Sequence, residues 1–322
     1  MSDLYKEYKG VLFLNRRTTK EDLEFVENEF QVRDDDIYNI TYPKSGTTWM
    51  IEILSLIQKN GDPSWSNTVP NWERVPWIEE LDVAQRLQHS EEHPRLISSH
   101  LPKHIFMKSF NDSKAKVIYT VRDPKDAAVS LYYFSKMCTV FKDPESMDSF
   151  LEEYLTENMP YGSWFNHVKG WMGLLGKDNF MFLTYEDLQK DLRGSVIKIC
   201  KFLGKELDDE AVDSVVENAS FKKMKQNNMA NFALLPPGYM NQEKSPFMRK
   251  GTTFSGTTSM DTQFESIRFI YPNFFFFLYT FPLPIFGHSE ITRCNYTLHC
   301  LAPTKVFSPV LFNPRNSSDT KA

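Results

Sequence analysis

The chain has 322 residues, of which 41% are hydrophobic and 25% charged, and its formal net charge at pH 7 is −5. This ordinary globular composition excludes a collagen-like, coiled-coil or wholly disordered chain, and the acidic balance argues against a nucleic-acid partner. The four cysteines include no C-x-x-C pair, so we expect neither a disulfide scaffold nor a zinc site, and the reducing cytoplasm is the default compartment. The first residues hold no apolar run of the kind that a signal peptide needs.

Short apolar runs alternate with stretches of helical periodicity along the first part of the chain. We expect strands over 36–41, 94–98, 116–121 and 180–184, and helices over 49–59, 126–136 and from Glu186 onwards. Strands that alternate with helices indicate an α/β fold, here a single domain with a central parallel sheet flanked by helices. Ligands of such sheets bind beyond the carboxyl ends of the strands, so functional residues are expected directly after each strand.

The loop between the first strand and the first helix reads Tyr-Pro-Lys-Ser-Gly-Thr-Thr-Trp over residues 42–49. Gly46 permits a tight turn whose N–H groups can bind an anion at the start of a helix, and Lys44 adds a positive charge. Lys44 precedes the glycine, so the Walker pattern of ATPases and kinases is absent. The alternative is a plain helix-capping loop, because Ser and Thr commonly cap helices.

A second polar motif, Arg-Asp-Pro-Lys-Asp-Ala-Ala-Val-Ser over residues 122–130, follows the third strand. Arg122 stands at the strand end and Ser130 lies about two helical turns further on. Both can meet one phosphate group, Arg122 with two parallel N–H donors and Ser130 with its hydroxyl. The alternative is a surface arginine that pairs with Asp123 or Asp126.

Together with Arg249-Lys250-Gly251, these two motifs resemble the cytosolic sulfotransferases, which use 3′-phosphoadenosine 5′-phosphosulfate (PAPS) as cosubstrate. The resemblance covers residues 1–251, and the overall pattern is most similar to the amine-sulfating branch. It implies one α/β domain with the P-loop-like sulfotransferase fold and a reaction that needs no metal. The implied acceptor is a small molecule with an amine or hydroxyl group, either a xenobiotic or an endogenous amine, alcohol or steroid-like compound.

The resemblance also implies which residues hold the nucleotide. The loop from Lys44 to Trp49 matches the family's 5′-phosphosulfate loop. All matched positions are Lys44, Ser45, Gly46, Thr47, Thr48 and Trp49 in that loop, with Trp49 on the adenine; Arg122, Ser130, Arg249, Lys250 and Gly251 at the 3′-phosphate; and Tyr185, Phe221 and Met224 in the adenine pocket. Ala219 stands where some relatives have a hydroxyl residue, so one donor is missing there.

The resemblance implies that His100 is the catalytic base, because it matches the family's histidine in Ser-Ser-His-Leu-Pro over residues 98–102. An imidazole with an ordinary pKa near 6.5 can accept the proton that an acceptor loses as it attacks sulfur. His104 is the main rival by its closeness in sequence. Some phenol-sulfating relatives have a lysine where this chain has Ser98, which argues mildly against a phenol-type pocket.

The implied chemistry is in-line sulfuryl transfer, in which Lys44 and the loop N–H groups stabilise the negative charge of the leaving phosphate. An amine acceptor adds a difficulty, because an alkyl amine with a pKa near 10 is mostly protonated at pH 7, and an apolar pocket would have to lower that pKa. Candidate lining residues, each also readily explained as core, are Trp77, Phe134, Met137 and Phe232. The carboxylates of Glu79 and Glu80 either attract a cationic amine or are simply solvated.

The composition changes after residue 251, where charged residues become sparse and Phe, Ser, Thr and Pro dominate residues 252–322. The Gly-Asp-Trp-Lys block, the dimerisation pattern and the closing helix of the family are all absent from this segment. We therefore expect a sulfotransferase domain over 1–251, a disordered or poorly packed tail over 252–322, and no firm basis for the family homodimer. A catalytically impaired isoform that still binds the nucleotide is the alternative function, since a missing closing segment loosens the nucleotide site.

The phenylalanine-rich run over 269–286 raises the separate question of a membrane anchor. A spanning helix needs about 20 apolar residues, and this run is interrupted by several prolines. The sequence therefore favours a disordered or aggregation-prone tail over insertion, and we expect no membrane partner.

Overall fold

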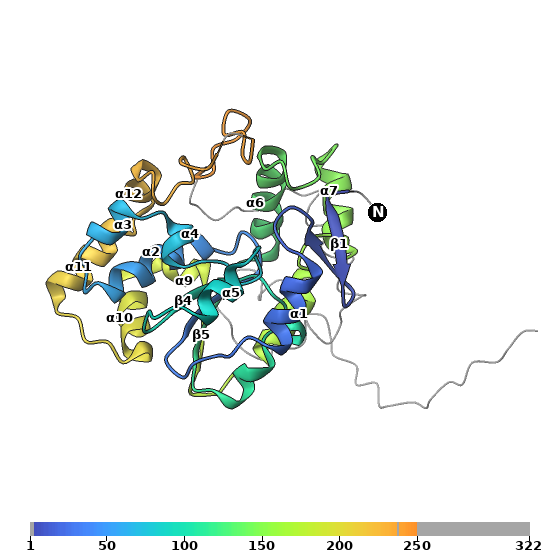
Figure 1. Ribbon diagram of the computed structural model, residues 1–322. Coiled ribbons are helices and arrows are strands. Elements are labelled where there is room, and N and C mark those ends of the chain that lie inside the picture. Colours follow the sequence, from blue (N-terminus) through green and yellow to red (C-terminus); the bar gives the residue numbers. More distant parts are fainter. Residues whose placement is uncertain (1–2, 237, 250–322) are drawn as a thin grey trace, which may run out of the picture. The chain divides into compact units, whose positions relative to one another are not determined.

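The computed structural model describes residues 3–236 and 238–249 (Figure 1). It has the expected α/β architecture, with a four-stranded parallel sheet between helices and a separate two-stranded hairpin. The elements are β1 (Tyr5–Tyr8), β2 (Val11–Leu14), α1 (Lys20–Asn28), β3 (Ile37–Thr41), α2 (Thr47–Gln58), α3 (Ser64–Thr68), α4 (Asn71–Arg74), α5 (Val83–Gln88), β4 (Leu96–Ser99), the 3₁₀ turns η1 (Lys103–Ile105) and η2 (Lys108–Asp112), β5 (Lys116–Val121), α6 (Pro124–Met137), α7 (Met147–Leu155), α8 (Trp164–Met172), β6 (Phe180–Thr184), α9 (Tyr185–Lys190), α10 (Leu192–Leu203), α11 (Asp209–Asn218) and α12 (Phe221–Gln226). The predicted tail over 252–322 lies outside the described residues.

The parallel sheet has the strand order β4-β3-β5-β6, and all three pairings are parallel. Every residue of the central strand β3 is buried, as expected for a sheet covered on both faces. The four strands are those that the sequence predicts, with β4 starting two residues later than expected. Because the strands are parallel, the residues that follow Thr41, Ser99, Val121 and Thr184 meet at one edge of the sheet.

The helices that follow β3 and β5 both start earlier than the sequence predicts. α2 begins at Thr47, directly after Gly46, which adopts φ = +102° and makes no side-chain cap hydrogen bond. α6 begins at Pro124, because the Asp123 carboxylate accepts the N–H groups of residues 125 and 126 and proline is favoured at the first position of a helix. Both helix starts therefore lie immediately beyond the strands that lead to them.

Several elements were not predicted, among them the N-terminal hairpin, the short helices α3 to α5, the helices α7 and α8, and the helices after α9. The N-terminal hairpin β1–β2 is followed by α1, whose Thr19 and Asp22 form a reciprocal capping box. The helices α10, α11 and α12 lie together on one side of the molecule, away from β1 and α7 (Figure 1). Apolar residues of α2, α10 and α11 form one continuous cluster with the sheet, which holds α2 against the strands.

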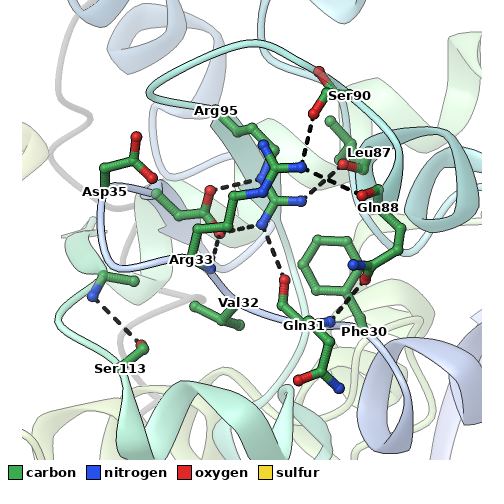
Figure 2. Close-up of polar contacts among 12 residues, drawn as sticks. Phe30, Gln31, Val32, Arg33, Asp35, Leu87, Gln88, Ser90, Arg95 and Ser113 are labelled. Carbon is green, nitrogen blue, oxygen red and sulfur yellow. Dashed lines mark hydrogen bonds and ion pairs between the residues drawn. The ribbon is translucent and has the colours of Figure 1, made fainter.

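A closed polar network holds the amino end of the sheet (Figure 2). Arg95, just before β4, donates from Nε and Nη2 to the two carboxylate oxygens of Asp36, just before β3, at 2.7 and 2.6 Å. Both side chains are fully buried. Arg95 also donates to the carbonyls of Leu87 and Gln31, and Arg33 ties the adjoining loop by donating to the carbonyl of Ser90.

Among the described residues, no helix is both long and apolar enough to cross a membrane.

Candidate active site

The loop over 42–46 turns sharply between β3 and α2. Lys44 and Gly46 both have positive φ, +69° and +102°. A Cβ atom on Gly46 would lie 2.9 Å from the Tyr185 ring, so position 46 needs glycine both for its backbone conformation and for the approach of that ring. The turn brings the start of α2 to the carboxyl edge of the sheet, where its N–H groups can face an anion.

One cavity of about 490 Å³ opens at this edge of the sheet. The residues predicted from the sequence that line it are Lys44, Gly46, Thr47, Thr48, Trp49, His100, Arg122, Ser130, Tyr185, Phe221, Met224 and Arg249. Ser45 does not line the cavity; its side chain is fully buried, and its hydroxyl has no hydrogen-bond partner among the described residues. Lys250 and Gly251 lie outside the described residues.

Three of the cationic side chains that line the cavity are those of Lys44, Arg122 and Arg249. The Lys44 ammonium lies 4.1 Å from the ring centre of Phe134 and 4.5 Å from that of Phe247. Its burial, together with the charges of Arg122 and Arg249, lowers the pKa of Lys44 to about 7. A lysine in this position gains from any anion that enters the cavity, because an anion favours its charged form.

Arg122 is buried rather than on the surface, which corrects the alternative interpretation of that residue. Its guanidinium lies 4.3 Å from the ring centre of Tyr185, and it donates to the carbonyl of Lys44 at 3.3 Å. Asp126 is 4.0 Å away, so the predicted alternative partner is nearby. The Arg249 guanidinium lies over the Tyr133 ring at 4.4 Å.

Aromatic side chains line the neighbouring part of the cavity. The Trp49 indole donates to the carbonyl of Ala219 at 2.8 Å, and its ring meets Tyr185 edge-on at a centroid distance of 5.3 Å. Phe221 and Met224 come from α12 and complete this wall. The main chain of Ala219, whose side chain offers no hydroxyl, thus fixes the indole.

The imidazole of His100 has a defined tautomer. Its Nδ1 lies 2.8 Å from the carbonyl oxygen of Thr41, which can only accept, so Nδ1 carries the proton and Nε2 does not. The Trp77 indole N–H donates to Nε2 at 3.3 Å. Burial, reinforced by the charge of Lys44, lowers the pKa of His100 to about 4. The expected ordinary pKa near 6.5 is therefore wrong, and His100 is neutral at physiological pH.

The other candidate histidines do not line the cavity. His104, the rival in sequence, is exposed on η1. His167 is almost fully buried in α8, where it contacts the main chain of His100 rather than the cavity.

Further aromatic side chains line the same cavity. Trp77, Phe134 and Phe232 line it, whereas Met137 is buried in the core. Lining residues that the sequence did not single out include Arg17, Trp72, Phe141, Tyr161 and Phe247. Most of these come from segments far from the two motifs, and no local pattern marks them.

Neither predicted acidic residue is a solvated carboxylate. Glu79 is fully buried, and burial raises its pKa to about 7. Glu80 lines the cavity but forms an ion pair with Arg17. Within the described ranges, no cluster of three or more His, Cys, Asp or Glu side chains could hold a metal ion.

Comparison with known proteins identifies the family. The sulfotransferase domain family matches residues 34–271. The chain belongs to the sulfotransferase family. Human sulfotransferase 2B1 is 53% identical over 247 residues, which are 77% of this sulfotransferase and 67% of the human chain. The guinea-pig 3-beta-hydroxysteroid sulfotransferase is 46% identical over 78% of this chain and 87% of its own.

Solved structures agree with this identification. The mouse sulfotransferase SULT7A1, complexed with PAP, superimposes with a TM-score of 0.69 at 28% identity, covering 84% of this sulfotransferase and 96% of the mouse chain. The sequence resemblance to the sulfotransferases is thereby confirmed, and so is the fold.

Proposed function

We propose that this sulfotransferase transfers the sulfuryl group of PAPS to a hydroxyl group of an apolar small molecule. The observation that carries the proposal is a single cavity whose lining combines the cations of Lys44, Arg122 and Arg249 with aromatic side chains and with His100, whose Nε2 is unprotonated. The cations suit the phosphates of a nucleotide, and the aromatic side chains suit an apolar acceptor.

The cationic residues of the cavity fit the nucleotide. Lys44 shares the cavity with Arg122 and Arg249, and burial together with the repulsion of the two arginines lowers the pKa of Lys44, a cost that bound phosphate groups relieve. Lys44, Thr47 and Thr48 would hold the 5′-phosphosulfate, and Arg122, Ser130 and Arg249 the 3′-phosphate. The sequence match also assigns Ser45, Lys250 and Gly251 to the nucleotide site. When bound, PAPS supplies the sulfuryl group.

His100 and Lys44 have complementary roles in the transfer. The Thr41 carbonyl holds the Nδ1–H of His100, so the lone pair lies on Nε2. Once the acceptor hydroxyl takes the place of the Trp77 indole N–H there, Nε2 accepts the proton that the hydroxyl loses as its oxygen bonds to sulfur. Lys44 stabilises the negative charge on the phosphate oxygen whose bond to sulfur breaks. The low pKa of His100 makes it a weak base in the free enzyme, and the negative charge of the nucleotide raises that pKa.

A hydroxyl acceptor suits this cavity better than a cationic amine. Glu79 is buried against the main chain of His100, and Glu80 is paired with Arg17, so both carboxyl groups already have partners. The 46% identity to a relative named 3-beta-hydroxysteroid sulfotransferase supports an acceptor of the steroid alcohol class. The amine preference implied by the sequence remains a prediction, as do the cytoplasmic location and the doubtful homodimer.

Nucleotide binding without turnover is the second candidate function, because we expect the sequence to depart from the family after Arg249-Lys250-Gly251, although the family match runs to residue 271. A turnover assay separates the two. The purified full chain is incubated with PAPS carrying ³⁵S, and with a neutral hydroxysteroid, a simple alcohol or an alkylamine. Transfer to the hydroxysteroid that is lost in Lys44→Ala but kept in Lys20→Ala, an exposed control on α1, supports the enzyme. Faster transfer to the alkylamine would contradict the hydroxyl preference, and no transfer despite PAP binding would support the second candidate.

A further inference from the structure

The main chain of His100 is held from both sides by buried side chains that the proposed chemistry does not use. On one side, the carboxyl Oε1 of Glu79 accepts the His100 N–H at 2.8 Å. On the other side, Nε2 of His167 lies 3.2 Å from the His100 carbonyl oxygen. That oxygen can only accept, so His167 carries its proton on Nε2 and donates it. The two side chains are 0% and 1% exposed.

Glu79 is fixed in place by the segments around it. Its carbonyl accepts the Thr18 hydroxyl at 2.6 Å, which ties it to the segment after β2. The Ser99 hydroxyl, at the end of β4, accepts the N–H of Leu101 at 2.9 Å and so holds the next turn of the same segment. The other carboxyl oxygen, Oε2, is buried without a hydrogen-bond partner among the described residues. A buried oxygen in that state costs stability, which a purely structural residue could avoid.

His167 is fixed just as firmly from the other side. Since its Nε2 is a donor, its Nδ1 accepts the hydroxyl of Tyr119 at 2.9 Å. Its ring stacks on Tyr119 and meets the edge of Tyr42 at centroid distances of 5.7 and 5.6 Å. One turn along α8, the Trp171 indole donates to the carbonyl of Leu101 at 3.1 Å, so α8 holds two successive peptide groups of this segment.

We propose that Glu79 and His167 are positioning residues for His100, a pair that we call the His100 clamp. The proposal rests on the proposed function, in which His100 accepts the acceptor proton. The clamp fixes the N–H and the carbonyl on either side of the His100 Cα. It thereby keeps the Nδ1–H of His100 on the Thr41 carbonyl and the unprotonated Nε2 at the cavity. A base displaced by about 1 Å can lose a hundredfold in rate, so two buried contacts on its main chain bear directly on turnover.

Paired substitutions separate positioning from folding. Glu79→Gln keeps an oxygen acceptor, and His167→Gln keeps an N–H donor at the place of Nε2, whereas Glu79→Ala and His167→Phe remove the contacts. We expect both removals to lower kcat by about tenfold to a hundredfold with the Kd for PAP unchanged. Both glutamine variants should recover most of kcat. Glu27→Gln, a change at a buried carboxylate on α1, is the control that should leave kcat unchanged.

A second readout does not depend on turnover. In ¹⁵N-imidazole NMR spectra, His100 of the wild-type chain should show a protonated Nδ1 and an unprotonated Nε2, with its signals assigned by their loss in His100→Ala. Glu79→Ala and His167→Phe should each give a mixture of the two tautomers. PAP binding shows whether a removal variant folds. If Glu79→Ala or His167→Phe does not fold, the proposal is tested with the glutamine variant at that position and with the removal variant at the other position.

Two results would overturn the clamp: unchanged kcat and an unchanged His100 tautomer in folded removal variants, or a loss of kcat in the glutamine variants as large as in the removals. A wild-type chain without turnover on any acceptor would instead count against the proposed function. In that case the NMR spectra still decide whether Glu79 and His167 fix the imidazole.

Discussion

At the amino end of the parallel sheet, Arg95 and Asp36 neutralise each other in a fully buried ion pair. At the carboxyl end, Lys44, Arg122 and Arg249 line one cavity, and burial together with the charges of the two arginines lowers the pKa of Lys44. The same sheet thus has one end whose charges are satisfied within the chain and another whose positive charges favour an anionic ligand. The first end is expected to govern stability and the second binding and turnover.

The largest expected effect is at the carboxyl end. His100→Ala removes the proton acceptor and should lower kcat by about 10²–10⁴-fold, while the midpoint of thermal unfolding stays close to that of the wild type. Steady-state kinetics and thermal unfolding measure both quantities. His104→Ala, at an exposed histidine outside the cavity, is the control that keeps full kcat. Equal losses of kcat in the two variants would show that His100 is not the proton acceptor.

The opposite pattern is expected at the amino end. Arg95→Ala leaves the carboxylate of Asp36 buried without its partner and should lower the free energy of unfolding by about 3–5 kcal/mol. Urea denaturation measures this change. The folded fraction should keep the wild-type Kd for PAP, so a large loss of affinity in that fraction would show that the two ends are not separable.

Removing one cation from the cavity should weaken binding in a way that depends on the ligand. Arg122→Ala should raise the Kd for PAP by about tenfold to a hundredfold, because hydrogen bonds to charged groups contribute about 1.5–3 kcal/mol. Adenosine 5′-phosphate lacks the 3′-phosphate, so its Kd should change much less. Fluorescence titration of both ligands measures the difference, with Arg193→Ala on the exposed face of α10 as the control. An equal loss for both ligands would place the 3′-phosphate elsewhere.

The smallest expected effect is a displacement of the pH profile. In the free enzyme, His100 accepts a proton only above its pKa of about 4, and Lys44 is charged only below its pKa of about 7. The value of kcat/KM should therefore rise with pH through about 4 and fall through about 7. Bound nucleotide raises both pKa values, so the kcat profile should move to higher pH. Lys44→Arg should remove the alkaline limb, and a limb that persists in that variant would belong to another group.

The site at the carboxyl end of the sheet was readable in the sequence, because its motifs follow strand ends, whereas the Arg95–Asp36 pair at the amino end was not predicted. The four strands are short apolar runs between polar residues, and the residues after them carry the recognisable motifs. Local geometry explains where the boundaries moved: Gly46 in a left-handed conformation and the Asp123 cap start α2 and α6 early.

What the sequence could not show depends on contacts between distant segments. The pKa of His100 falls because tertiary packing buries the imidazole, and no local sequence pattern indicates that burial. Glu79 was expected to attract an amine or to be solvated, yet it lies 21 positions from the main-chain N–H that it accepts. The contact between His167 and the His100 carbonyl likewise joins residues 67 positions apart.

Calorimetric titration of the full chain with PAP tests whether the carboxyl end of the sheet binds an anionic nucleotide. We expect saturable binding that is lost or strongly weakened in Lys44→Ala and Arg122→Ala and unchanged in Lys20→Ala. A folded chain that does not bind PAP, or that binds it equally in all four forms, would show that the nucleotide does not bind there.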